Sequence, residues 1–397
     1  MSENPTPDGK VSLFSPEVSA CPQGVYARLH SKCPVAHDAW SGNPIISRYE
    51  DVIWALRHPE IFSSEMEIQM GLGTERPMIP QQIDPPIQTA YRRILDPQFS
   101  RRRMEMIEPD VRAHARQLVE AFADDGECEF NSAFAIPLPC TAFLRLLGLP
   151  TEELELFLEL KDGIIRPQTQ TDDPDKASEI RAKTGKRIYA YFEKLIEERR
   201  TTKGDDLMSH LVEVEFDGRK LTDNEILDIS FLLLLGGLDT VTATLGCSVA
   251  FFANHPDHRR KLAADPALVP AAVEELLRWE TPVTMVPRVA KREIELHGVT
   301  IAEGQLVSLL LGASNLDDAE FTSGQTVDFD RKRNRHLAFG AGPHRCLGSH
   351  LARMELRVAL EELHARIPDY QIKPGETPRY SAGIREVQYL PLVWERR

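Results

Sequence analysis

The chain has 397 residues, of which 42% are hydrophobic and 27% are charged. These fractions are typical of a folded globular protein and exclude a disordered, collagen-like or disulfide-scaffold chain. Lysine and arginine number 47 against 61 aspartate and glutamate residues, and the net charge of −14 disfavours binding to nucleic acid or to an anionic membrane.

The six cysteines are scattered without paired spacing, and residues 1–10 lack the apolar core of a secretory signal. A cytoplasmic protein with reduced thiols is the simplest interpretation. No stretch reaches the roughly 18 consecutive apolar residues of a membrane span, so we expect none. The most apolar run, 231–235, ends at two glycines and is typical of a buried helix.

In chain order, the patterns predict a mainly α fold with a small β region, built as a single large domain over residues 1–397. Strand-rich parts are expected at approximately 40–60, 283–310 and 375–395. The first of these contains two short apolar runs, 44–47 and 51–54. A helical body is expected at approximately 84–280 and again at 346–366, because apolar residues recur there at three- and four-residue spacing. The polar, proline-bearing segment 166–175 interrupts this body and is predicted to be a loop.

The longest predicted helix begins at Thr222, where the sequence Thr-Asp-Asn-Glu225 has the form of a capping box. It runs to Asn254, which at about 1.5 Å per residue gives a length of ~50 Å. Gly236 and Gly237 lie in its apolar middle. Glycine at such a position costs up to ~1 kcal/mol, so this part of the helix is a candidate for function.

The segment 339–348 is the part of the sequence that is most informative about chemical function. It reads Phe-Gly-Ala-Gly-Pro-His-Arg-Cys-Leu-Gly. Its glycines Gly340, Gly342 and Gly348 allow positive φ or close approach to a flat partner. Cys346 stands just before a helical run, where free amides and the helix dipole favour the thiolate. Such a thiolate is a good axial ligand for haem iron, because it pushes electron density toward O–O cleavage.

Two other interpretations of this segment are open. The cysteine could be a buried structural residue beside a glycine turn. Cys346 and His350 could also share a metal, since they lie four residues apart on one helical face, but zinc would need two more ligands, and none stands nearby in the sequence.

The whole segment resembles the haem-binding signature of the cytochrome P450 family. Three other motifs resemble that family in the same order: Asp84-Pro-Pro86 with Arg92, Gly236-Gly-Leu-Asp-Thr240, and Glu275-Leu-Leu-Arg278. The resemblance extends from about residue 40 to 394 and is strongest to the soluble bacterial enzymes related to the camphor hydroxylase. It implies a P450-like haem domain with a long central helix over a haem b. Cys346 would be the iron ligand, and Phe339, Gly340 and Gly348 would lie beside the cofactor.

Each supporting motif also has a plainer interpretation. Glu275 and Arg278 alone would be a solvated i, i+3 pair, whereas the resemblance implies a buried structural ion pair that engages the stretch 331–336. Thr240 could simply donate to the carbonyl of Gly236 and bend the helix. Because reductive cleavage of dioxygen consumes two protons, we expect the Thr240 hydroxyl, with the Asp239 carboxylate behind it, to relay them.

The haem propionates are anions that need cationic or hydrogen-bonding partners. The resemblance implies Arg92, Arg288 and His344 for this role. Many relatives carry histidine where this chain has Gln88, and we expect the glutamine to donate in its place.

The sequence contains no flavin or nicotinamide motif and no cysteine cluster for an iron–sulfur centre, so electrons must come from another protein. The stretch 92–103 has five arginines against one acid, and the stretch 331–357 has seven bases against one acid. We expect these stretches to dock an acidic ferredoxin. The alternative is that the arginines only hold the propionates and the Glu275–Arg278 pair.

The substrate pocket is expected to be apolar, with the stretch 66–78 as its roof and the loop 166–175 as a mobile lid. The lining residues would be Leu232, Leu235, Gly236, Val283, Met78 and Ile384. The camphor hydroxylase binds its substrate through a tyrosine before Asp-Pro-Pro, but here the sequence 75–80 has no tyrosine, so we do not expect camphor.

Together these features predict a monomeric haem-thiolate monooxygenase for a small-to-medium apolar substrate, using dioxygen and a separate ferredoxin. The substrate would be a terpenoid, a steroid-like or an alkyl-aromatic molecule. The alternatives are a peroxide-driven peroxygenase, against which the Asp239-Thr240 pair counts, and a non-catalytic haem or ligand sensor.

Overall fold

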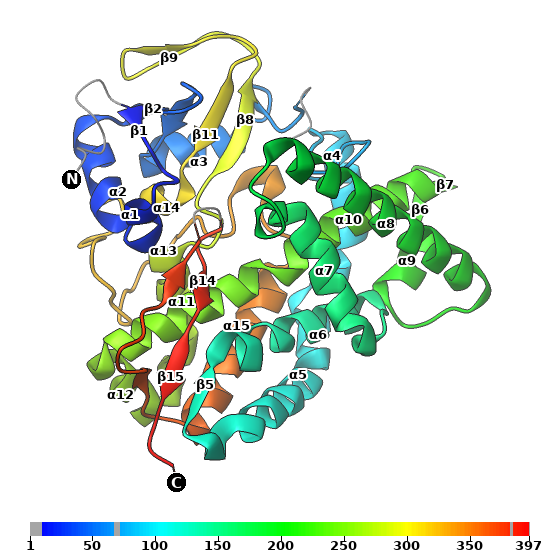
Figure 1. Ribbon diagram of the computed structural model, residues 1–397. Helices are drawn as coiled ribbons and strands as arrows, with labels where there is room; N and C mark the ends of the chain where they lie inside the picture. The colour runs from blue at the N-terminus through cyan, green and yellow to red at the C-terminus, as the bar shows by residue number, and fades with distance from the viewer. Residues whose placement is uncertain (1–9, 67–71, 382–383, 397) are drawn as a thin grey trace. The chain divides into compact units, whose positions relative to one another are not determined.

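The computed structural model describes residues 10–66, 72–381 and 384–396 (Figure 1). Most of these residues are helical and the strands are short, which confirms the predicted fold class. Contacts divide the chain into two compact units. The first comprises residues up to 63, 104–138 and from 240 on, and the second comprises 64–103 and 139–239. Neither unit is a continuous segment, and the single domain over residues 1–397 stays a prediction.

The strands of the first unit form one mixed sheet and three smaller pairings. The sheet has the order β1-β2-β3-β11-β8-β4, with β3 parallel and β8 antiparallel to β11. Its strands are β1 (Lys10–Val11), β2 (Val35–Asp38), β3 (Pro44–Ile46), β4 (Phe62–Ser63), β8 (Val286–Ala290) and β11 (Leu306–Leu309). The smaller pairings are β9 (Ile294–Leu296) with β10 (Val299–Ile301), β13 (Arg379–Tyr380) with β14 (Val387–Tyr389), and β12 (Gln371–Ile372) with β15 (Pro391–Val393) and β5 (Glu127–Glu129). The strand-rich regions predicted at 283–310 and 375–395 are therefore confirmed.

The first predicted strand region, 40–60, is only partly correct. The run at 44–47 forms β3, but the run at 51–54 lies in helix α3 (Tyr49–Arg57). Val52, Ala55 and Leu56 form one buried face at helical spacing. Glu50 and Asp51 in the first turn suit the positive end of the helix dipole. Four apolar-rich residues were too few to distinguish a helix from a strand.

Three helices form the core that carries the cysteine segment. They are α11 (Thr240–Asn254), α13 (Val269–Glu280) and α15 (Ser349–Arg366), and each packs against the other two. The other helices of this unit are α1 (Pro16–Ala20), α2 (Gln23–Lys32), α12 (Pro256–Ala264), α14 (Leu311–Ser314) and most of α5 (Arg101–Phe122).

The second unit is helical apart from one hairpin. Its helices are α4 (Ile87–Leu95), most of α6 (Pro137–Leu147), α7 (Leu154–Ile165), α8 (Pro174–Thr201), α9 (Leu207–Glu213) and α10 (Asp223–Leu238). Helices α7, α8 and α10 pack together. The hairpin of β6 (Glu215–Phe216) and β7 (Arg219–Lys220) turns through Asp217 and Gly218, which both have positive φ. This hairpin and β5 lie inside the predicted helical body, so that prediction missed these short strands.

The predicted helix 222–254 exists, but it is broken at Asp239. Its start is confirmed, because the Thr222 side chain accepts from the Glu225 amide and the Glu225 side chain accepts from the Thr222 amide. Helix α10 ends at Leu238 and α11 begins at Thr240. The segment 223–254 is long and apolar enough to cross a membrane, but 67% of its most apolar window is buried inside the protein, which identifies a core helix.

The predicted loop 166–175 is also more ordered than expected. Residues 167–169 form a short 3-10 helix, and α8 begins at Pro174 with Asp173 as its N-cap. The proline at the first helical position and the aspartate before it start a helix rather than prolong a loop. Mobility of this segment stays a prediction.

Candidate functional site

The cysteine loop lies in the first unit and is closed by one backbone hydrogen bond. The Cys346 amide donates to the Phe339 carbonyl at 2.8 Å. Gly340 and Gly342 both have positive φ, and a Cβ on Gly342 would lie 2.3 Å from the Leu56 carbonyl oxygen, so a side chain is excluded there. Cys346 stands three residues before the start of α15 and is exposed.

The residues of this loop fit a flat cofactor held by a thiolate. The Cys346 side chain is accessible even though Ala341 and Leu337 of the same segment are buried. A Cβ built on Gly348 would meet nothing within 4 Å, so there is open space next to the cysteine. Among the residues that the structure describes, no group of three or more His, Cys, Asp or Glu side chains could hold a metal ion, so the Cys346 thiol suits haem rather than a four-ligand zinc site.

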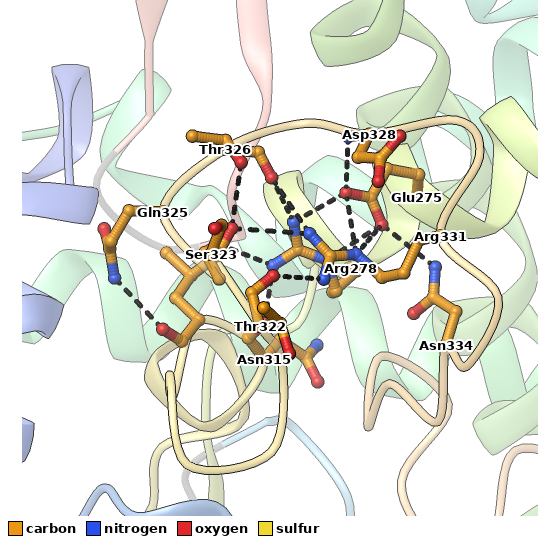
Figure 2. Close-up of polar contacts among 12 residues, drawn as sticks. Glu275, Arg278, Asn315, Thr322, Ser323, Gln325, Thr326, Asp328, Arg331 and Asn334 are labelled. Atoms are coloured by element: carbon orange, nitrogen blue, oxygen red, sulfur yellow. Dashed lines mark hydrogen bonds and ion pairs between the residues drawn. The ribbon is translucent and has the colours of Figure 1, made fainter.

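Glu275 and Arg278 of α13 form a fully buried ion pair, as predicted (Figure 2). Their side chains are 1% and 0% exposed, and the guanidinium donates to both carboxylate oxygens, at 2.9 and 2.7 Å. The other guanidinium N–H groups of Arg278 donate to the carbonyls of Asn315, Gly324 and Thr326, so all five of its donors are used.

The same pair organises the segment that leads to the cysteine loop. Arg331 and Asn334 donate to the Glu275 carboxylate at 3.1 and 3.0 Å, within the predicted stretch 331–336 (Figure 2). The Asn315 side chain then accepts from the amide of Leu337, two residues before Phe339. A buried charge pair whose hydrogen-bonding groups are all satisfied fixes this segment in one conformation.

Asp239, at the break after α10, is buried and held by two cations of the second unit. Its carboxylate lies 2.9 Å from Lys161 Nζ and 2.9 Å from Arg166 Nη2. Burial by itself lowers the pKa of Lys161, but the charge of Asp239, together with the charge of Asp162 and the hydrogen bond to Asp239, outweighs it and the pKa is raised. Sequence reasoning missed both partners. The available signal was a lysine in the apolar helix 154–165, where a charge needs a partner.

Helix α10 keeps an accessible stripe on an otherwise buried surface. Leu232 and Leu235 are partly exposed and Gly236 is exposed, whereas Phe231, Leu233 and Leu234 are buried. A Cβ on Gly236 would meet nothing within 4 Å. The stripe has helical spacing and is apolar, so this face can line a substrate cavity.

The remaining predicted pocket residues differ in accessibility. In the first unit, Val283 and Ile384 are partly exposed, and so is Thr240, which was predicted as a catalytic residue. In the second unit, Met78 is only 4% exposed and packs as a core residue. Residues 67–71 of the predicted roof lie outside the described residues.

The predicted propionate partners lie on separate elements. Gln88 and Arg92 are one turn apart on α4, and Arg92 Nε lies 2.7 Å from the Asp96 carboxylate. Arg288 lies on β8 and is buried, and His344 lies in the cysteine loop. Their contact with propionates stays a prediction.

Many arginines of the two basic stretches are engaged in ion pairs. Arg331 is bound to Glu275, Arg353 to Glu274 and Arg357 to Glu108. These contacts support the alternative that part of the positive charge has a structural role. Arg101 and Arg102 are exposed at the start of α5.

Comparison with protein-family models matches residues 167–366 to the family described as Cytochrome P450. Mycinamicin IV hydroxylase/epoxidase of Micromonospora griseorubida is 34% identical, covering 91% of each chain. Steroid C26-monooxygenase of Mycobacterium tuberculosis is 32% identical, covering 94% of this chain and 93% of its own. Among solved structures, a mutant of P450 EryK in complex with erythromycin B superimposes with a TM-score of 0.87 at 32% identity, covering 97% and 98% of the two chains.

Proposed function

Because this chain belongs to the cytochrome P450 family, a family of monooxygenases that bind haem b through a cysteine thiolate, we propose that it hydroxylates a small-to-medium apolar substrate with electrons from a separate ferredoxin. The observation that carries the substrate class is the apolar accessible stripe of Leu232, Leu235 and Gly236 on α10. The relatives support the same class, since their names include a steroid monooxygenase and a mycinamicin hydroxylase.

In this proposal, Cys346 supplies the thiolate that binds the haem iron. The bound haem supplies the oxidising chemistry that activates dioxygen. The backbone hydrogen bond between Cys346 and Phe339 and the glycines of the loop hold the sulfur in place. The Glu275–Arg278 network anchors the segment before it, so the sulfur does not depend on a freely moving loop.

Thr240 and Asp239 handle protons at the break between α10 and α11. Thr240 is a partly exposed residue, and its hydroxyl can both accept and donate a proton. Lys161 and Arg166 hold the Asp239 side chain in one orientation within its own unit. In this proposal Asp239, the preceding residue in the chain, carries protons together with the Thr240 hydroxyl, while the apolar stripe excludes bulk water from the substrate.

The ferredoxin would approach a basic surface, and the exposed Arg101 and Arg102 are the best candidates for it. Exposed charges steer association and contribute less to the final affinity. Arg102→Glu should therefore slow reduction by an acidic ferredoxin and weaken its salt dependence. Reduction by dithionite should be unchanged, because that small reductant needs no docking surface.

The first test is the carbon monoxide difference spectrum of the dithionite-reduced protein, compared with Cys346→Ala. A strongly red-shifted Soret band in the wild type, lost in the variant, is the expected result. Titration with terpenoid, steroid and alkyl-aromatic compounds should then drive the iron to high spin with at least one class. A wild-type spectrum typical of histidine-ligated haem would refute the assignment of Cys346. Product formation with peroxide alone, at the rate of the ferredoxin system, would favour a peroxygenase.

A further inference from the structure

Two adjacent glutamates of α13 bind different partners. Glu275 holds Arg278 and Arg331, whereas Glu274 binds the first turns of α15, the helix that follows Cys346. Arg353 donates to both Glu274 oxygens, from Nε at 2.6 Å and from Nη2 at 2.9 Å. This bidentate pairing fixes the plane of the guanidinium.

His336 completes the site in a defined tautomer. The Ala338 amide donates to its Nδ1 at 3.2 Å, so Nδ1 is an acceptor and Nε2 carries the proton. Nε2 lies 3.2 Å from the Glu274 carboxylate and donates to it. Burial alone raises the pKa of Glu274, but the contacts from His336 and Arg353 lower it to about 2.

The Arg353 guanidinium lies over the ring of Phe339, with 4.4 Å between its central carbon and the ring centroid. The His336 ring is 5.8 Å from the same ring. Phe339 in turn accepts the hydrogen bond that closes the cysteine loop. A continuous series of contacts therefore runs from Glu274 through Arg353 and Phe339 to Cys346.

We propose that Arg353 is a positioning residue, which fixes Phe339 and thereby the geometry of the Cys346 thiolate toward the haem. The proposal rests on the assigned role of Cys346 as the iron ligand. Contacts in the outer shell of a metal site orient the ligand and tune the metal, so loosening Phe339 should weaken thiolate ligation. The contact has the geometry of a cation–π interaction, and Arg353 is only 30% exposed.

The test uses the haem-loaded full-length protein and the variants Arg353→Met and Glu274→Gln. Arg335→Met is the matched control, because Arg335 also donates to a carboxylate through Nε and Nη2, that of Glu320, and no ring contact of its guanidinium is seen among the described residues. The readouts are the rate at which the reduced carbon monoxide complex loses its red-shifted Soret band and the midpoint potential of the iron. We expect both test variants to lose the band about tenfold faster than the wild type, consistent with the strength of a partly desolvated cation–π contact. The control should match the wild type.

The direction in which each variant shifts the midpoint potential distinguishes a positioning role of Arg353 from a purely electrostatic one. Arg353→Met removes a positive charge and Glu274→Gln a negative one, so a purely electrostatic role would shift the midpoint potential in opposite directions and leave the band stable. That result would overturn the proposal, as would an equal loss in Arg335→Met. Arg353→Lys, which keeps the charge but not the planar fork, should give an intermediate rate even if the methionine variant folds poorly. A wild type without the red-shifted band would refute the role of Cys346 itself, a separate outcome.

Discussion

In the proposed proton relay Thr240 supplies the hydroxyl, and the preceding residue, Asp239, is buried and ion-paired. Replacing it with alanine removes the only group of that side chain that exchanges protons. We expect Thr240→Ala to keep its haem spectrum but to release several times more peroxide per electron pair consumed. The measurement is the ratio of product to peroxide at equal electron uptake. Ser248→Ala, which removes a buried hydroxyl from the same helix, is the control. An unchanged ratio of product to peroxide in Thr240→Ala would show that Thr240 takes no part in the relay.

Arg278 illustrates how strongly a buried charge depends on its partners. With all five donors used and no exposure, its replacement by methionine leaves the carbonyls of Asn315 and Gly324 and part of the Glu275 carboxylate without their donor, and leaves the Thr326 carbonyl with Arg331 alone. We expect the free energy of unfolding to fall by about 3–5 kcal/mol, as for other broken buried pairs. For Arg335→Met, urea titration should show that the free energy of unfolding falls by less than about 1 kcal/mol, because the Arg335 side chain is 54% exposed. Similar losses in the two variants would contradict the buried role of Arg278.

At the scale of the element, the two neighbouring glycines of α10 have different reasons to be glycine. A Cβ on Gly237 would lie 2.3 Å from the Phe143 ring, which is 3% exposed. A Cβ on Gly236 would meet nothing within 4 Å. Gly237 is therefore required for packing, and Gly236 keeps space open beside the helix.

This contrast gives a matched pair of variants. Gly237→Ala should destabilise the protein by about 1–3 kcal/mol through overpacking. Gly236→Ala should be neutral or stabilising by up to ~1 kcal/mol, because alanine favours the helix. The same Gly236 change should weaken binding of bulky apolar substrates. Thermal unfolding and substrate titration test both statements, and a larger loss of stability in Gly236→Ala would contradict the assignment.

At the scale of the whole molecule, one buried histidine sets part of the response to acid. His364 of α15 lies 2.8 Å from the Leu360 carbonyl through Nδ1, which must carry the proton, and its Nε2 lies 3.2 Å from the Tyr370 hydroxyl. Burial, with a smaller contribution from the charge of Arg259, lowers its pKa from 6.5 to about 4. The histidine is therefore neutral in the folded protein at pH values where the unfolded chain already binds the proton.

The sign of the effect follows from this difference. The stability contributed by neutral His364 is complete above pH 6.5 and is lost as the pH falls from 6.5 to about 4, by up to ~3 kcal/mol. Glu225 and Glu274, whose pKa values are lowered from 4.5 to about 2, lose their contribution mainly as the pH falls below 4.5, so the two ranges overlap only near pH 4 to 4.5. Unfolding titrations at several pH values should show a shallower slope between pH 4 and 6.5 for His364→Gln. An unchanged slope would assign the acid sensitivity to other groups.

The sequence by itself determined the local features of this protein: the capped start of α10, the glycine and cysteine loop, and the identity of the Glu275–Arg278 pair. These depend on short-range geometry and on residue spacing, which a sequence displays directly. Tertiary structure decided what each charge and each short apolar run does. It placed Lys161 and Arg166 on Asp239, bound Arg353 between Glu274 and Phe339, and folded residues 51–54 into α3. These partners are distant from one another in the chain, so residue spacing does not predict them. They pair because a buried charge or backbone group that lacks a hydrogen-bonding partner is costly.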